Sequence, residues 1–171
     1  MKKSFILFLI TFCALHFSFA QKDISIVYSP DKEVFLNKQK VNKETSLETV
    51  TSILGTPVIY KEYATGKVNY HYPKLGIAVH FVNNHLSFIG ANFNWDGDKT
   101  FPKTQFKGTF KIDNVLFNKD AKESRLSEVK SYKIHCFIPG MCMSDPKQGN
   151  NAIIVGFKDQ KLTQIGVEFK Q

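Results

Sequence analysis

The chain repeats itself at a spacing of 76 residues, and this internal similarity limits its possible folds more than any other feature. Segment 81–93 aligns without gaps on segment 157–169, with five identities in thirteen positions. The same spacing aligns Asn42-Lys43 with Asn118-Lys119 upstream. One spacing that holds across separate segments indicates a repeated structural unit. We therefore predict two copies, over residues 21–93 and 106–171, joined by a linker over residues 94–105. The identical pairs are Phe81/Phe157, Leu86/Leu162, Ile89/Ile165, Gly90/Gly166 and Phe93/Phe169.

Both copies show the same expected order of elements: a hairpin, a short helix and four strands. The hairpins should turn at residues 37–38 and 113–114. A capping pair, Thr45 and Glu48, should begin the first helix and Gly55 should end it, while Ser124 is the expected cap in the second copy. Alternating apolar and polar side chains predict the strands. The predicted fold class is α+β, with two tandem repeats that each pack a short helix on an antiparallel β-meander. The strands are expected at 58–63, 67–72, 77–82 and 86–93, and at 133–137, 141–144, 152–158 and 161–169.

The last two strands of each copy constrain the register. A two-residue turn at 83–84 would place their apolar side chains on opposite faces of the sheet. A three-residue loop over 83–85 would pair Val79 with Ile89 and bring both apolar sets to one face. We predict this longer loop, with a counterpart at 159–161. Each copy would then bury one sheet face under its helix and leave the other open to water.

The first twenty residues have the pattern of a secretory signal peptide. Lys2 and Lys3 precede a mostly apolar run over residues 5–17, and Ser18-Phe19-Ala20 offers small residues at the −3 and −1 positions. The run is shorter than the roughly 20 apolar residues that span a bilayer. We predict cleavage after Ala20, no transmembrane segment in the mature chain, and a periplasmic or secreted location.

Export changes the interpretation of the cysteines, since only Cys136 and Cys142 would remain. An even pair in an oxidising compartment is a disulfide candidate, and two buried thiols are the alternative. A three-residue loop over 138–140 would place the two cysteines opposite each other, whereas a two-residue loop would put them on opposite faces. A redox or metal site would need a CxxC-type spacing or further ligands, which the sequence lacks.

The charge of the chain argues against nucleic acid as a partner. The formal net charge is +8, but Arg125 is the only arginine. Guanidinium groups suit bidentate contacts with phosphates and base edges, whereas lysines act as solvated point charges. The lysines could favour an acidic partner or anionic lipid headgroups, and they also promote solubility. The sequence does not fix the oligomeric state.

Two short motifs carry a resemblance to known exported proteins. Leu54-Gly55-Thr56-Pro57, followed by a meander with Phe81-x-Asn-Asn-x-Leu86, resembles the β-lactamase-inhibitor-protein-like and SmpA/OmlA-like fold. The tandem pair looks like the two-copy arrangement of the inhibitor. Segment 101–114 is similar to an uncharacterised domain family of Gram-negative bacteria. The resemblance implies non-catalytic protein binding through an open sheet face or its loops, and it assigns no individual residue.

The predicted open face of the first copy supplies most of the candidate binding residues. Phe88 is either an exposed anchor or a side chain packed under a loop or against the other copy. Trp95, the only tryptophan, is either a linker plug or an anchor. The complete candidate set is Asn69, His71, His80, Phe88, Asn92 and Trp95.

Other chemistry finds weaker support in the sequence. His71 and His80 should be diagonal neighbours, but no third metal ligand accompanies them. Oxygen-bearing residues alternate from 94 to 100, yet the glycine and glutamate of a calcium-binding EF-hand are missing. No familiar catalytic or nucleotide-binding motif occurs. We therefore expect no cofactor, no enzymatic activity, and a role as an inhibitor, immunity or envelope accessory protein. A structural envelope protein is the alternative, followed by a hydrolase or metal-binding protein.

Overall fold

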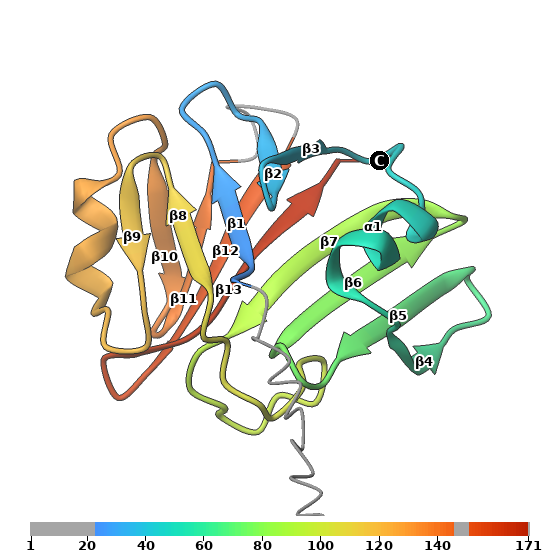
Figure 1. Cartoon of the computed structure of the whole chain (residues 1–171). Coiled ribbons are helices and arrows are strands. Elements are labelled where there is room, and N and C mark those ends of the chain that lie inside the picture. Colours follow the sequence, from blue (N-terminus) through green and yellow to red (C-terminus); the bar gives the residue numbers. More distant parts are fainter. Residues whose placement is uncertain (1–22, 146–150, 171) are drawn as a thin grey trace, which may run out of the picture.

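Two β-sheets lie face to face and make up most of the protein (Figure 1). The computed structural model describes residues 23–145 and 151–170, so the predicted signal peptide lies outside the described residues. The smaller sheet has five strands in the order β3-β2-β1-β8-β9. Its strands are β1 Ser25–Tyr28, β2 Val34–Leu36, β3 Gln39–Val41, β8 Thr109–Ile112 and β9 Val115–Phe117.

The larger sheet has eight strands in the order β10-β11-β12-β13-β7-β6-β5-β4. All its neighbouring strands are antiparallel. Each strand begins and ends within one residue of its expected bounds, because the alternation of apolar and polar side chains follows the strand period. The strands are β4 Val58–Glu62, β5 Lys67–Tyr72, β6 Ile77–Val82, β7 His85–Asn92, β10 Ile134–Ile138, β11 Met141–Ser144, β12 Asn151–Lys158 and β13 Lys161–Phe169.

The α+β prediction is wrong, because the protein is mostly β. The one α-helix among the described residues is α1, Leu47–Leu54, which is capped by Ser46 rather than Thr45. Its expected counterpart is only a short 3₁₀ helix, η1, Glu123–Glu128. Strand β1, which the sequence analysis missed, joins the hairpins of both copies into one small sheet. That sheet provides the second layer over the core, so the chain does not form two separate helix-on-sheet units.

The strand order is symmetric in both sheets. In the small sheet β1 is central, with the equivalent hairpins β2-β3 and β8-β9 on either side. In the large sheet the two four-strand meanders meet where β7 pairs with β13, and Gly90 stands directly opposite Gly166 there. Around this pair, Ile89 opposes Val167 and Ala91 opposes Ile165. The 76-residue spacing exchanges these two pairs, as expected for a local two-fold axis through the glycine pair.

The predicted pairing of Val79 with Ile89 is confirmed, but the predicted three-residue loop is wrong. The turn contains only Asn83 and Asn84, which have φ values of 48° and 66° and form a two-residue hairpin turn. A one-residue bulge at Ser87 then restores the register of the apolar side chains.

The second copy solves the register problem in the same way. Its turn contains Asp159 and Gln160, and its bulge lies at Thr163, the residue equivalent to Ser87. The two hydroxyl-bearing residues therefore mark the same bulge in both copies.

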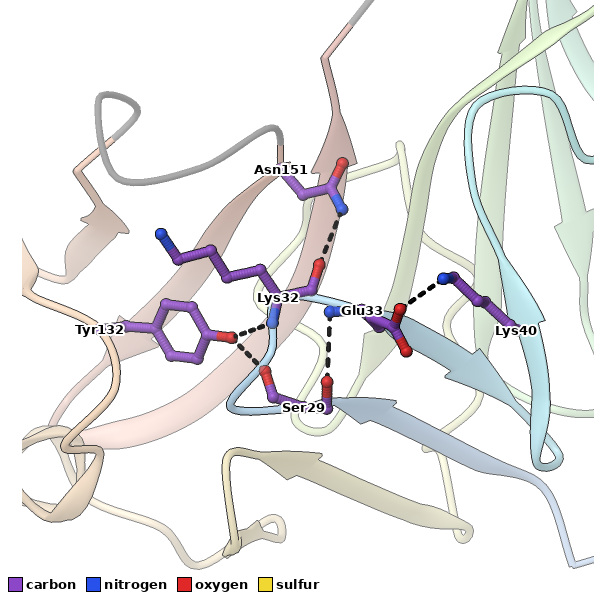
Figure 2. Close-up of polar contacts among 6 residues, drawn as sticks. All are labelled: Ser29, Lys32, Glu33, Lys40, Tyr132 and Asn151. Atoms are coloured by element: carbon purple, nitrogen blue, oxygen red, sulfur yellow. Dashed lines mark hydrogen bonds and ion pairs between the residues drawn. The ribbon is translucent and has the colours of Figure 1, made fainter.

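Tyr132 ties the β1–β2 turn to the second copy (Figure 2). Its hydroxyl donates to the carbonyl of Ser29 and accepts from the amide of Lys32, at 3.1 Å in the second case. The ring of Tyr132 stacks on Tyr28 with 4.7 Å between centroids. Burial raises the pKa of Tyr28 to about 12, so that phenol stays neutral. These contacts join residues about 100 positions apart into one core.

Candidate binding surface

The outer face of the large sheet, which points away from the small sheet, carries the candidate residues. Over the first copy, this face is covered by the linker. The side-chain amide of Asn92 lies 3.0–3.1 Å from the carbonyl oxygens of Pro102, Lys103 and Thr104. His71 Nε2 lies 2.9 Å from the carbonyl oxygen of Thr100. Through such contacts the linker folds back onto the strands that it was expected only to connect.

The prediction that the first copy leaves this face open is therefore wrong. Four of the candidate residues are at most 8% exposed: Asn69, His71, His80 and Asn92.

Phe88 packs under the linker and against the second copy, which is one of the two arrangements predicted for it. Its ring stacks on His80 with 4.8 Å between centroids and meets the edge of Phe101 at 5.8 Å. The far end of the ring lies over Gly90 and Gly166, where a Cβ atom on either residue would overlap it. The two matching glycines thus leave room for one aromatic ring at the centre of the sheet.

His80 lies beneath the rings of Phe88 and Phe101 and is neutral. Burial, reinforced by the positive charge of Lys67 and by His71, lowers the pKa of His80 to about 3. Burial also lowers the pKa of His71, although the Thr100 carbonyl and Asp98 oppose that shift. Asn69 stands opposite His80 in the register, and neither the Asn69 amide nor His80 Nε2 has a hydrogen-bond partner among the described residues.

Trp95 lies at the start of the linker and remains 40% exposed. Its indole N–H donates to the Asp98 carbonyl at 3.2 Å, and the Lys103 ammonium sits 4.8 Å from the ring centroid. The Asp98 carboxylate accepts from the amide and hydroxyl of Thr100, so it organises the turn. This tryptophan is therefore anchored at its indole N–H and has Lys103 over its ring, and its exposed part can contact another molecule.

A groove of about 280 Å³ runs over the seam between the two copies. Phe88, Gly166 and Gly156 lie along it, and Phe101 of the linker and Ile154 of β12 contribute apolar walls. The polar lining comes from both copies and the linker, namely Lys67, His80, Ser87, Asp98, Thr100, Gln164 and Glu168. Apart from His80 and Phe88, the sequence analysis did not select these residues. The 76-residue spacing could have identified two of them, because it aligns the candidate residues Phe88 and Asn92 with Gln164 and Glu168 of the groove.

Over the second copy the outer face carries no such cover in the described part of the chain. Met143 and Ile154 pair across β11 and β12, next to Gly166, and both are only half-buried. Met141 on the same face is 49% exposed and also lines the groove. We call Met141, Met143 and Ile154 the open half of the outer face. Methionine adapts its shape readily, which makes it a frequent residue of binding surfaces.

A disulfide closes the hairpin next to the open half. Cys136 stands opposite Cys142 with 3.8 Å between Cα atoms, so the predicted bridge is present. The turn again has two residues, Pro139 and Gly140, and a bulge at Phe137 brings the cysteines to one face. The carboxylate of Glu123 lies within 4.8 Å of both sulfurs, but bonded sulfurs are not thiolate ligands.

The fold and the groove define a duplicated β protein of two sheets. The linker covers one half of the outer face of its large sheet, and a groove lies at the boundary of the covered half. The chain belongs to the family described as a domain of unknown function, DUF7738, whose family model matches residues 25–127. The matched segment begins with β1 and extends into η1, so it includes the entire linker. Comparison with curated proteins and with solved structures found no match. No helix in the described ranges is long and apolar enough to cross a membrane.

Proposed function

We propose that the protein is an exported, non-catalytic binding protein that holds a protein partner on the open half of its outer face and in the adjoining groove. Inhibitors, immunity factors and envelope accessory proteins are three classes of protein that act by binding a partner without catalysis. The observation that carries the proposal is the apolar surface of Met141, Met143 and Ile154, continuous with a groove built by both copies.

Two further features support this proposal. Interfaces commonly combine an apolar centre with a polar rim, and the groove sets Phe88 and Phe101 among lysine, carboxylate and amide groups. Phe88 is already immobilised by His80 and the two glycines, so little side-chain entropy would be lost on binding. Export is supported by the disulfide, since such bonds persist mainly in oxidising compartments.

The experiment is affinity capture from an envelope extract of the source organism, with charge substitutions in the open half. We expect wild-type protein to retain one stoichiometric partner and Ile154→Glu to lose it, because a desolvated carboxylate in an apolar interface costs several kcal/mol. Leu116→Glu is the matched control. Leu116 is 43% exposed and lies on β9 in the small sheet, away from the proposed surface.

A partner retained equally by wild type and both variants would contradict the proposed surface. Loss of the partner in Leu116→Glu but not in Ile154→Glu would move the interface to the small sheet. Circular dichroism and urea unfolding of each variant establish that the fold is intact before capture is compared.

A further inference from the structure

Four of the eight exposed large apolar side chains among the described residues gather at one end of the large sheet. Phe137 and Ile138 are 66% and 57% exposed, and Met141 follows them across the hairpin turn. The antiparallel order places the end of β10, the start of β11, the end of β12 and the start of β13 at this end of the sheet (Figure 1). The end of β7, which leads to Trp95, lies there as well. We call Trp95, Phe137, Ile138 and Met141 the apolar end.

The hairpin tip within the apolar end is rigid and lies against β12. The Cys136–Cys142 bridge closes it, and the Gly140 carbonyl accepts the Phe157 amide at 2.6 Å. Gly140 has a φ of 78° and packs against the Phe157 carbonyl, so the turn is held against β12. A rigid tip with exposed apolar side chains can enter an apolar medium but does not enclose a ligand.

Lysines lie beside the apolar end. Lys158 and Lys161 face each other at the neighbouring β12–β13 turn, with Asp159 between them, and Lys103 lies over Trp95. No ion pair among the described residues involves these three lysines. Asp96 and Asp98 also lie at this end, where the Asp96 carboxylate accepts from Gln164 and the Asp98 amide, and the Asp98 carboxylate accepts from Thr100. Without Lys2 and Lys3 of the predicted signal peptide the formal charge of +8 falls to +6, which still adds a general attraction to anionic surfaces.

We propose that the apolar end docks on an anionic lipid bilayer. Phe137 and Ile138 enter the boundary between headgroups and acyl chains, and Trp95 rests at headgroup level, where amphipathic rings are favoured. Lys158 and Lys161 contact anionic headgroups, each strengthening binding by up to about fivefold near such a surface. This activity does not depend on a protein partner, and it would place the groove beside the membrane surface.

The test is co-sedimentation of the purified protein with vesicles of phosphatidylglycerol mixed with phosphatidylcholine, and with vesicles of phosphatidylcholine alone. We expect binding to the anionic vesicles that weakens in high salt and in Lys158→Gln/Lys161→Gln. Phe137→Ser should weaken it about tenfold and Phe137→Ser/Ile138→Ser further, because each removes an apolar side chain from the lipid boundary. Leu116→Ser, an exposed apolar residue of the small sheet, should bind like wild type.

Trp95 provides a second readout because it is the only tryptophan. Brominated phosphatidylglycerol should quench its emission on binding. Failure of wild type to sediment with anionic vesicles, equal loss in Leu116→Ser, or sedimentation without Trp95 quenching would each overturn the proposal. If Phe137→Ser/Ile138→Ser lost a captured protein while wild type ignored vesicles, the apolar end would belong to the protein interface instead.

Discussion

Acidification should destabilise the protein through His80. Its pKa is about 3 in the folded protein because the imidazole is buried near Lys67 and His71, whereas an unfolded histidine titrates near 6.5. Below pH 6.5 the unfolded chain therefore binds a proton that the folded chain refuses. The stability that His80 contributes is complete above pH 6.5 and is lost as the pH falls toward 3.

The magnitude follows from this difference in pKa. At pH 4.5, two units below the unfolded value, the expected loss is about 3 kcal/mol at about 1.4 kcal/mol per unit. That is a large share of the roughly 5–15 kcal/mol by which a domain is stable. His71 shifts in the same direction and should add to the loss.

The assay is urea unfolding at pH 7 and at pH 4.5, compared between wild type and His80→Gln. The variant cannot titrate at this position, so its loss on acidification should be smaller by about 3 kcal/mol. His85→Gln is the control, because His85 is half-exposed at a turn beside Glu44 and lies outside the buried layer. An equal acid-induced loss in wild type and His80→Gln would refute the buried, neutral imidazole.

Three further substitutions test the packing on which the surface depends. Gly166→Ala should destabilise the protein by about 1–3 kcal/mol in urea unfolding, because the new Cβ overlaps the ring of Phe88, and Phe88→Leu in the same chain should recover part of the loss. Asn92→Ala should cost about 1–3 kcal/mol and speed hydrogen exchange across residues 98–106, since three linker carbonyls lose their donor; unchanged exchange would contradict the linker contacts. Tyr132→Phe should lower the free energy of unfolding by about 1–2 kcal/mol, because the Ser29 carbonyl loses the phenol as a donor and the Lys32 amide keeps only its bond to that carbonyl; a neutral effect would show that solvent replaces the phenol.

The strands of the large sheet could be predicted because their information is local. Alternation in segments such as Ile77–Val82 predicts the strand and the face that meets the core, but it does not predict that Ala78 and His80 on the opposite face are buried as well. The bulges could not be predicted in the same way, because Ser87 and Thr163 do not differ in type from hydroxyl residues elsewhere in strands. The register was predicted correctly only because the apolar side chains of the two strands have to lie on one face. The sequence analysis achieved this with a three-residue loop, whereas the protein uses a two-residue turn and a bulge.

Strand β1 and the linker cover were missed for different reasons. Ile24, Ile26 and Tyr28 occupy every second position and are buried, so the sequence contained a strand pattern that the sequence analysis did not use. The linker contacts depend on distant partners, such as the amide of Asn92 and the carbonyls of residues 102–104, which local patterns do not encode. Phe101 was the available hint, since a large apolar side chain in a connecting segment usually packs against something.

The most direct test of the binding surface is photo-crosslinking in living cells of the source organism. A photoreactive amino acid is placed at position 154 in the open half or, as a control, at position 116 on the small sheet. We predict one discrete adduct of defined mass from position 154 and none from position 116. Equal adduct patterns from both positions, or no adduct from position 154, would contradict a partner on the open half of the outer face.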